Sequence, residues 1–328
     1  MAGARARGRS LLSARQLPGA RQWPPFPHMQ QAKEGTAVQR HGWLMVRGSH
    51  LMNQHGLDVR LRGVSLSTSQ SSGGAFYAMS TVQWLVQDWN VTVVRAALGV
   101  EPGGFLADPR TERRKVQAVI DAAIEHGIYV IVAWHDKYAE KHTEQAVAFL
   151  EEIANWASNI PNIMFEPFGE PQAQPWSRVL KPYHQTVLNA IRQRSEHVVI
   201  VGVSHWSHRL EEAAKDPLTG LNVVYSVHFS AESPLPELRS NISAAMQHGA
   251  SIFASRWVAT NKDSPGATYA LRSGNMGDWM GFLAERHISD TFYALAGDGT
   301  GSQALLPGTT AIAGWPSDGL SKVGAWVR

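Results

Sequence analysis

Short apolar runs rich in β-branched residues recur along the chain, and amphipathic stretches separate them. The runs are nearly continuous in hydrophobic residues rather than alternating, which is typical of parallel strands covered on both faces. Eight of these runs predict strands: residues 58–66, 91–98, 129–136, 163–171, 198–206, 223–230, 251–258 and 290–297. Eight strands with intervening helices predict an α/β fold, a single-domain (β/α)8 barrel.

One helix is clear from its pattern, at residues 110–127, where apolar positions keep the spacing of one helix face and Gly127 is a natural stop. Ahead of the second strand, residues 41–64 predict a small hairpin that closes the bottom of the barrel. No Pro- or Ser-rich linker interrupts residues 37–328, so we expect this range to form one domain.

The first 36 residues differ in composition from the rest. They carry five arginines before the first acidic residue, Glu34. An Arg-rich, acid-poor segment without an apolar h-region indicates an organelle transit peptide rather than a secretory signal. A disordered leader or a misassigned start codon explains the same composition, so the localisation stays open. We exclude residues 1–36 from the predicted fold.

Composition narrows the function classes. The 328 residues are 44% hydrophobic, which is enough for a large core, and the formal charge is only +3. The basic residues form no stripe along a helix, so nucleic acid is not an expected partner. No apolar run reaches the roughly 18 residues of a membrane span, so no membrane partner is expected either. The absence of cysteine excludes disulfides and thiolate chemistry but leaves the redox compartment open.

Candidate site residues lie where the predicted strands end, because the loops of a barrel enzyme converge at the carboxyl ends of its strands. The polar or aromatic residues there are Ser65, Ser67, Arg95, His135, Asp136, Glu170, His205, Trp206, His228, Arg256, Trp257 and Asp298. A guanidinium such as that of Arg95 would hold Glu166 or Glu170, and we favour structural support as its role. Glu166, within its strand, should point into the barrel.

Three histidines and several tryptophans need separate interpretation. His135, His205 and His228 lack the spacing of a local metal motif, so we predict hydrogen-bonding histidines, no metal site and no cofactor. Tryptophans at strand ends are most often core, although exposed indole faces also grip sugar rings. Among them we expect Trp206 and Trp315 to be exposed.

Several longer stretches resemble glycoside hydrolase family 5, in its bacterial endo-β-1,4-glucanase (cellulase) branch. They are "VVRAAL", "AAIEHGIYVIVAWHD", "PNIMFEPFGEP", "LKPYHQTVLNAIR", "VIVGVSHWSH", "HGASIFASRWVAT" and "GWPSDGLSKVGAWVR", in family order. The resemblance runs nearly from His41 to Arg328. It implies a (β/α)8 barrel, a groove for a β-glucan chain and retaining hydrolysis by two glutamates.

The resemblance also implies roles for individual residues. Glu170 in "GEP" matches the acid/base of the family's Asn-Glu-Pro motif. Arg95, His135 and His228 match its active-site arginine and two histidines, and Trp206 matches an aromatic residue of the cleft.

The departures from the family pattern gather at the same site. Arg256 stands where the family has its nucleophilic glutamate, and Gly169 replaces the asparagine before the acid/base. Ser230 replaces a tyrosine, Ser67 a histidine and Tyr293 a tryptophan.

Arg256 closes the retaining route, because a guanidinium stays protonated and cannot attack the anomeric carbon. A neighbouring cation also lowers the pKa of a carboxyl, so Glu170 should be an ionised partner rather than a proton donor. Three hypotheses follow. The first is a barrel without useful glycosidase turnover that keeps weak β-glucan binding. The second is an active endo-β-1,4-glucanase or transglycosylase that uses Glu170 and a substitute carboxylate: Asp136, Glu232 or Asp298. The third is a non-catalytic scaffold.

Overall fold

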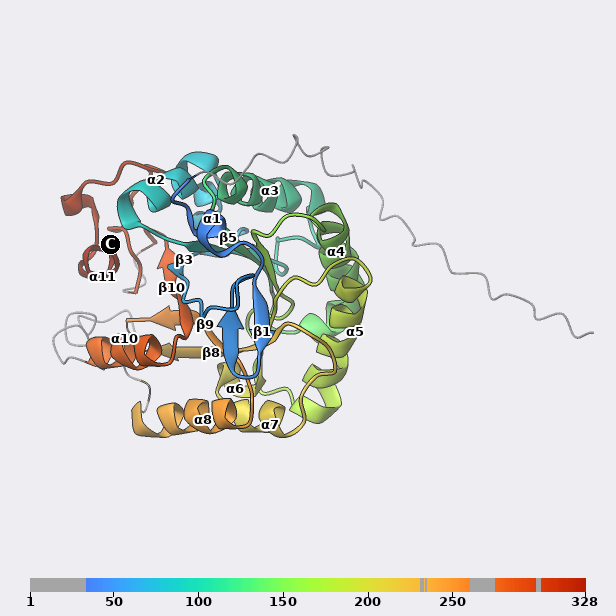
Figure 1. Ribbon diagram of the computed structural model, residues 1–328. Coiled ribbons are helices and arrows are strands. Elements are labelled where there is room, and N and C mark those ends of the chain that lie inside the picture. The colour runs from blue at the N-terminus through green and yellow to red at the C-terminus, as the bar shows by residue number, and fades with distance from the viewer. Residues whose placement is uncertain (1–33, 231–232, 234, 260–274, 299–301) are drawn as a thin grey trace, which may run out of the picture.

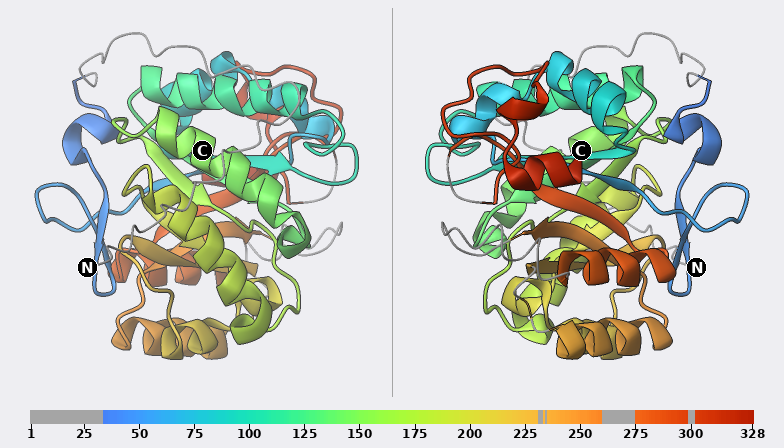
Figure 2. Two further views of the ribbon diagram at one scale, coloured as in Figure 1. Left: turned by 90° about the vertical axis from the view of Figure 1, so that its right-hand side faces the viewer. Right: turned by 90° about the vertical axis from the view of Figure 1, so that its left-hand side faces the viewer.

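The computed structural model describes residues 34–230, 233, 235–259, 275–298 and 302–328. Within them, eight parallel strands close into a barrel in the order β10-β3-β4-β5-β6-β7-β8-β9 (Figure 1). Helices surround the strands on the outside of the barrel in both side views (Figure 2). The (β/α)8 barrel predicted from the sequence is therefore confirmed.

The strands follow the predicted runs, with three clear differences in length. Their bounds are β3 (Arg62–Leu66), β4 (Val93–Gly99), β5 (Tyr129–His135), β6 (Ile163–Glu166), β7 (Val199–Val201), β8 (Val223–Ser230), β9 (Ile252–Val258) and β10 (Ser289–Leu295). The predicted runs at 58–66, 163–171 and 198–206 are longer than β3, β6 and β7, and Asp58 pairs with Met52 of the hairpin instead of with the barrel. β6 ends before Pro167, which has no N–H for the sheet, and β7 gives way to the short helix α6 (Ser204–Ser207).

The helices pack their apolar faces against the strands. The remaining α-helices are α1 (Ala37–His41), α2 (Met79–Trp89), α3 (Pro109–Glu125), α4 (Thr143–Trp156), α5 (Lys181–Arg192), α7 (Leu210–Lys215), α8 (Leu235–Gln247), α10 (Asn275–Glu285) and α11 (Lys322–Val327). Shorter helical turns are η1 (Ser72–Phe76), η2 (Ala139–His142), η3 (Trp176–Leu180) and η4 (Ser317–Gly319). None of the helices in the described part of the chain has the length and apolarity to cross a membrane.

The predicted helix at 110–127 shows how the sequence sets its ends. α3 begins at Pro109, whose missing N–H costs nothing at the first position of a helix, and the Asp108 side chain accepts a hydrogen bond from the Thr111 N–H. The helix ends at Glu125, and Gly127 takes a positive φ of 64° just beyond it.

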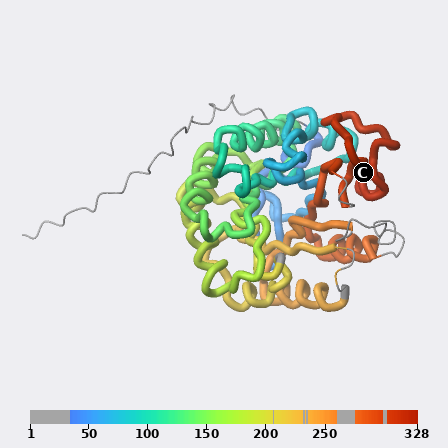
Figure 3. Tube along the Cα trace, turned by 180° about the vertical axis from the view of Figure 1, so that it is seen from behind, coloured from blue at the N-terminus to red at the C-terminus, as the bar shows by residue number. Residues whose placement is uncertain are grey.

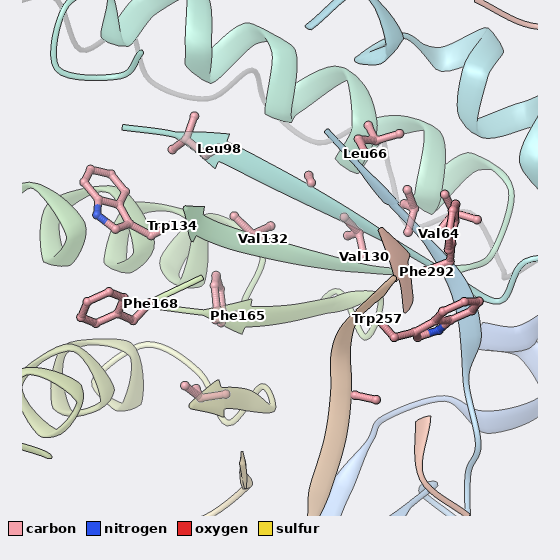
Figure 4. Close-up of a cluster of buried hydrophobic side chains, with 14 of the residues drawn as sticks. Val64, Leu66, Leu98, Val130, Val132, Trp134, Phe165, Phe168, Trp257 and Phe292 are labelled. Carbon is pink, nitrogen blue, oxygen red and sulfur yellow. The ribbon is translucent and has the colours of Figure 1, made fainter. Parts of the chain in front are cut away.

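Alternate residues of the strands face two different apolar layers. On β5, Val130, Val132 and Trp134 point outward into the large cluster between strands and helices (Figure 4). Tyr129 and Ile131 point inward, into a second cluster inside the barrel. This period of two follows from the pleat of a strand, and it decides which side chains reach the barrel interior.

A hairpin closes the bottom of the barrel, as the sequence predicts. Strands β1 (Met45–Arg47) and β2 (His50–Met52) pair antiparallel. Leu44, Leu51 and Leu61 from this region share the inner cluster with residues of six barrel strands. In Figure 2 the hairpin stands at one end of the barrel, beside the amino ends of the strands.

The prediction that Trp315, in the C-terminal segment, is exposed is wrong. Trp315 is 2% exposed, and its ring meets Phe76 and Trp89 edge to face at 6.2 Å each. Its Nε1 donates to the carbonyl of Ala311. Seen from the barrel mouth, the segment lies beside α2 (Figure 3). This long-range packing buries the indole, and the local sequence gives no sign of it.

Candidate functional site

The period of two brings charged residues of β4, β5 and β6 to the inside of the barrel. Val93 and Ile131 belong to the inner cluster, so Arg95 and His135 follow them inward on their strands. Met164 does the same for Glu166. His135 and Glu166 are the last residues of their strands, where a barrel carries its site, and Arg95 reaches Glu166 from the third position of β4.

A bulge in β9 presents Arg256. Opposite β8, Ser226 pairs with Phe253 but His228 pairs with Arg256, so β9 has one extra residue in this interval. The register against β10 shifts at the same place. A bulge changes the direction in which side chains point, and here it brings Ser255 and Arg256, two consecutive residues, to inward partners. The bulge is the physical reason why an apolar strand delivers an arginine to the mouth.

Arg95 and Glu166 form a fully buried ion pair. Arg95 Nε lies 2.5 Å from Glu166 Oε2, and neither side chain is exposed. Arg95 Nη1 also donates to Ser65 Oγ at 3.2 Å. Of the two carboxylates considered for Arg95, the structure pairs it with Glu166, and the prediction that Glu166 points into the barrel is confirmed.

Ser255 is the centre of a buried hydrogen-bond network. Its hydroxyl donates to Glu166 Oε1 at 2.6 Å. It must therefore accept from its other neighbours, Ser226 Oγ at 2.7 Å and His228 Nε2 at 3.2 Å. His228 is thus protonated on Nε2, and its Nδ1 is a lone-pair acceptor without a hydrogen-bond partner among the described residues. Burial, with the charges of Arg256 and Arg95, holds the pKa of His228 well below its ordinary value.

Glu170 lies in the loop after β6, four residues beyond the end of the strand. Its Oε1 is 3.3 Å from Arg256 Nη1 and its Oε2 is 3.3 Å from His135 Nε2. Burial by itself would raise the pKa of Glu170. The hydrogen bond and the charge of His135, followed by the charges of Arg256 and Lys137, outweigh it and lower the pKa well below its ordinary value. Glu170 is therefore an ionised carboxylate.

Arg256 has a second contact, with the ring of Tyr293 on β10. The guanidinium carbon lies 4.2 Å from the ring centroid, which is a cation–π geometry. The His135 ring lies nearly parallel to that of Tyr293, at 12° and 6.4 Å between centroids. Burial lowers the pKa of His135, whose Nε2 lies 3.3 Å from the Glu170 carboxylate.

A cavity of about 320 Å³ opens beside the ion pair. It is lined by Glu170, His208, His228, Phe229, Ser230, Ser233, Arg256 and Val258. Glu170 is the one carboxylate in this lining, as far as the chain is described. The lining thus brings four sequence candidates together: Glu170, His228, Ser230 and Arg256.

Gly169 is packed tightly under the site. A Cβ on this residue would lie 2.8 Å from Arg95 Nη2 and 3.0 Å from His135 Nδ1. Any side chain here requires those groups to move. The Gly169 N–H donates to the Trp134 carbonyl, which fixes the start of the loop that carries Glu170.

Other sequence candidates lie apart from the cavity or outside the description. Asp136 is buried, and both of its carboxylate oxygens have hydrogen-bond partners: Oδ1 accepts from the Tyr138 N–H, and Oδ2 lies 2.7 Å from His142 Nδ1. Trp134 and Trp257 are core residues. The backbone of Trp206 belongs to α6, but its side chain lies outside the described part of the structure, as does Glu232. Ser67 is nearly buried.

Sequence reasoning missed the hydroxyls of Ser226 and Ser255 and the role of His208. Ser226 precedes the candidates His228 and Ser230 at a spacing of two on β8, a signal that could have placed it on the same inner face. His208, on the loop after α6, donates from Nε2 to the His228 carbonyl at 2.8 Å. The described residues bring no three His, Asp or Glu side chains together in an arrangement that could hold a metal ion.

The closed barrel with a polar cluster at the carboxyl ends of its strands defines the class: a (β/α)8 barrel with its site at the mouth. The family model described as Cellulase (glycosyl hydrolase family 5) matches residues 52–299. The chain belongs to glycosyl hydrolase family 5.

Similar proteins include endoglucanases. Endoglucanase Z of Dickeya dadantii is 35% identical over 249 residues, which are 75% of this chain and 58% of that protein. The chain thus spans less than two thirds of the length of that relative. A solved structure from Cytophaga hutchinsonii is 35% identical, with a TM-score of 0.83 over 89% of this chain and 95% of its own.

The catalytic domain of Thermobifida fusca endoglucanase Cel5A is also similar. A Glu-to-Gln variant of that domain in complex with cellotetraose is 26% identical, with a TM-score of 0.81 over 89% of this chain and 98% of its own.

Proposed function

We propose that this family 5 barrel has lost retaining glycosidase turnover and keeps a weakened groove for β-glucan. The observation that carries the proposal is the ion pair of Glu170 with Arg256 at 3.3 Å inside the cavity. In this proposal Arg256 stands at the position of the family's nucleophilic glutamate, and Glu170 at that of its acid/base.

The chemistry of retaining hydrolysis supports the loss of turnover. That reaction needs two carboxyls about 5–5.5 Å apart, one ionised to attack and one protonated to assist the leaving group. Arg256 cannot attack, and Glu170 has no proton to give because its pKa is lowered. A fixed positive charge also opposes the cationic transition state.

An inverting reaction would need a second carboxylate about 6.5–9.5 Å from Glu170 with room for water between them. Glu170 is the one carboxylate that lines the cavity within the described residues. Asp136 already uses both oxygens in hydrogen bonds, which argues against it as a base. These facts favour the inactive barrel over an active glucanase with a substitute acid.

Retention of a glycan groove is supported by the relatives and by the lining of the cavity. The similar Thermobifida domain was solved with cellotetraose. In this chain the cavity keeps histidine and serine side chains beside the apolar wall of Phe229 and Val258. The other candidates for the groove are Arg95, His135, Gly169, Trp206 and Tyr293, and of these Tyr293 lies under the Arg256 guanidinium.

Hydrolysis assays test the proposal. We expect the purified protein to release no more reducing sugar from carboxymethyl-cellulose or barley β-glucan than its Glu170→Gln variant purified in parallel. That variant measures contaminating cellulase, and Endoglucanase Z serves as the positive control. Release well above the variant would overturn the loss of turnover. Calorimetric titration with cellotetraose tests the groove, and a flat titration to millimolar ligand would favour a scaffold instead.

A further inference from the structure

Tyr293 has the position of a sugar-stacking residue, but the cavity does not reach it. Tyr293 lies near the carboxyl end of β10, at the mouth of the barrel, and its side chain is partly exposed. Flat aromatic faces at such places stack against the apolar faces of sugar rings. Yet the described lining of the cavity includes Arg256 and not Tyr293.

The Arg256 side chain lies between the Tyr293 ring and the cavity. Its guanidinium lies over the Tyr293 ring at 4.2 Å from the centroid, while the same side chain forms one wall of the cavity. The ion pair with Glu170 holds the guanidinium in this place from the other side. Because a quarter of the Arg256 side chain is exposed, the arginine can leave the ring without crossing the core.

We propose that Arg256 is a gate that covers the aromatic face of Tyr293 and so determines which part of the mouth a glycan can use. A sugar that stacks on Tyr293 must first displace the guanidinium from both the ring and Glu170. In the native protein the ligand therefore occupies the side of the mouth formed by Phe229, Ser230 and Ser233. This inference rests on the proposed glycan groove and adds a specificity-determining role for Arg256 beyond the loss of the nucleophile.

A double-mutant cycle measured by calorimetry with cellotetraose tests the gate. Arg256→Ala uncovers the ring, and we expect it to tighten binding about tenfold, the scale of one good aromatic contact. Tyr293→Ala in the native background should leave the affinity within about twofold, because the covered ring does not touch ligand. In the Arg256→Ala background the same change should erase the whole gain.

Arg256→Met is the matched control, since it removes the charge but keeps an unbranched chain long enough to cover the ring. We expect its affinity to stay within about twofold of the native protein. Arg256→Ser repeats the uncovering if the alanine variant folds poorly, with circular dichroism as the check on folding.

Each outcome decides between the groove and the gate. A native protein that binds cellotetraose and loses affinity on Tyr293→Ala keeps the groove but overturns the gate. A gain in Arg256→Ala that survives Tyr293→Ala, or that Arg256→Met shares, also overturns it. Absence of binding in the native and the uncovered variants alike overturns both. Binding that appears only when the ring is uncovered, and requires Tyr293, supports the gate.

Discussion

Two arginine–glutamate pairs of the barrel share their residue types and differ in their surroundings. Arg95 and Glu166 meet at 2.5 Å with no exposed surface on either side chain. Arg256 and Glu170 meet at 3.3 Å, with 25% and 17% of their side chains exposed. The inner pair is held by Ser65 and Ser255, whereas the pair at the mouth borders a cavity.

The difference teaches where charge matters for stability and where it matters for chemistry. A buried pair has been taken out of water at high cost, so loss of one partner leaves an uncompensated charge in the core. A partly exposed pair loses little when broken, because water replaces the partner. We infer that Arg95–Glu166 maintains the barrel, whereas Arg256–Glu170 sets the charge at the edge of the cavity.

The largest effect is expected from Glu166→Gln. Arg95 would remain charged and buried without its anion, so the free energy of unfolding should fall by about 3–5 kcal/mol. Chemical denaturation at pH 7 measures the loss. The double variant Arg95→Met/Glu166→Leu is the control and should recover part of the stability, since no lone charge remains. A cost below about 1 kcal/mol for the single variant would show that the inner pair does not carry the barrel.

Ser255→Ala should have the next largest effect. It takes one hydrogen bond from Glu166 and the acceptor from His228 Nε2, so we expect a loss of about 1–3 kcal/mol by the same measurement. Ser226→Ala is the comparison, because it removes a single donor to Ser255 and should cost less. Equal costs would contradict the central place of Ser255.

Arg256→Met should change stability little. The ion pair it breaks lies at the mouth, so the free energy of unfolding at pH 7 should drop by about 0–1 kcal/mol in denaturant titration. The contrast with Glu166→Gln is then several-fold. A loss as large as that of the inner pair would remove the distinction between the two.

The smallest expected effect is the pH dependence of the stability difference between the native protein and Arg256→Met. The folded pKa of Glu170 lies below its unfolded value, so its stabilising contribution is present above the unfolded value of about 4.3 and is lost as the pH falls through the folded pKa. Arg256 contributes to this lowering. Thermal melts from pH 7 to 3 should therefore show the native protein and Arg256→Met converging in acid. A gap that widens in acid would contradict the sign.

Much of the fold could be predicted because strands covered on both faces leave long apolar runs. β8 (Val223–Ser230) has the bounds of its predicted run. The prediction fails beyond Val201, where the run to 206 includes the start of the short helix α6, because Val203 and Trp206 are too few to distinguish a helix from a strand by their spacing. The burial of Trp315 depends on α2, far away in the sequence, and could not be predicted locally.

The site was predictable in its residue types but not in its connections. Polar residues at strand ends predicted Glu170 and Arg256, and both line the cavity. Which residues Arg256 and Glu170 contact depends on the bulge in β9. That bulge is visible in the pairing of β9 with β8 but not in the sequence. Arg95 pairs with Glu166 rather than with Glu170, and the sequence does not show this choice because it depends on how β4 and β6 lie in the barrel.

The hairpin beneath the barrel has a consequence for how such a protein changes over time. Leu51 of β2 and Leu44, which precedes β1, belong to the inner cluster at the amino ends of the strands, so part of the packing inside the barrel lies away from the mouth. Substitutions at the mouth that leave this lower packing in place can therefore change the polar lining of the cavity without removing the floor of the barrel.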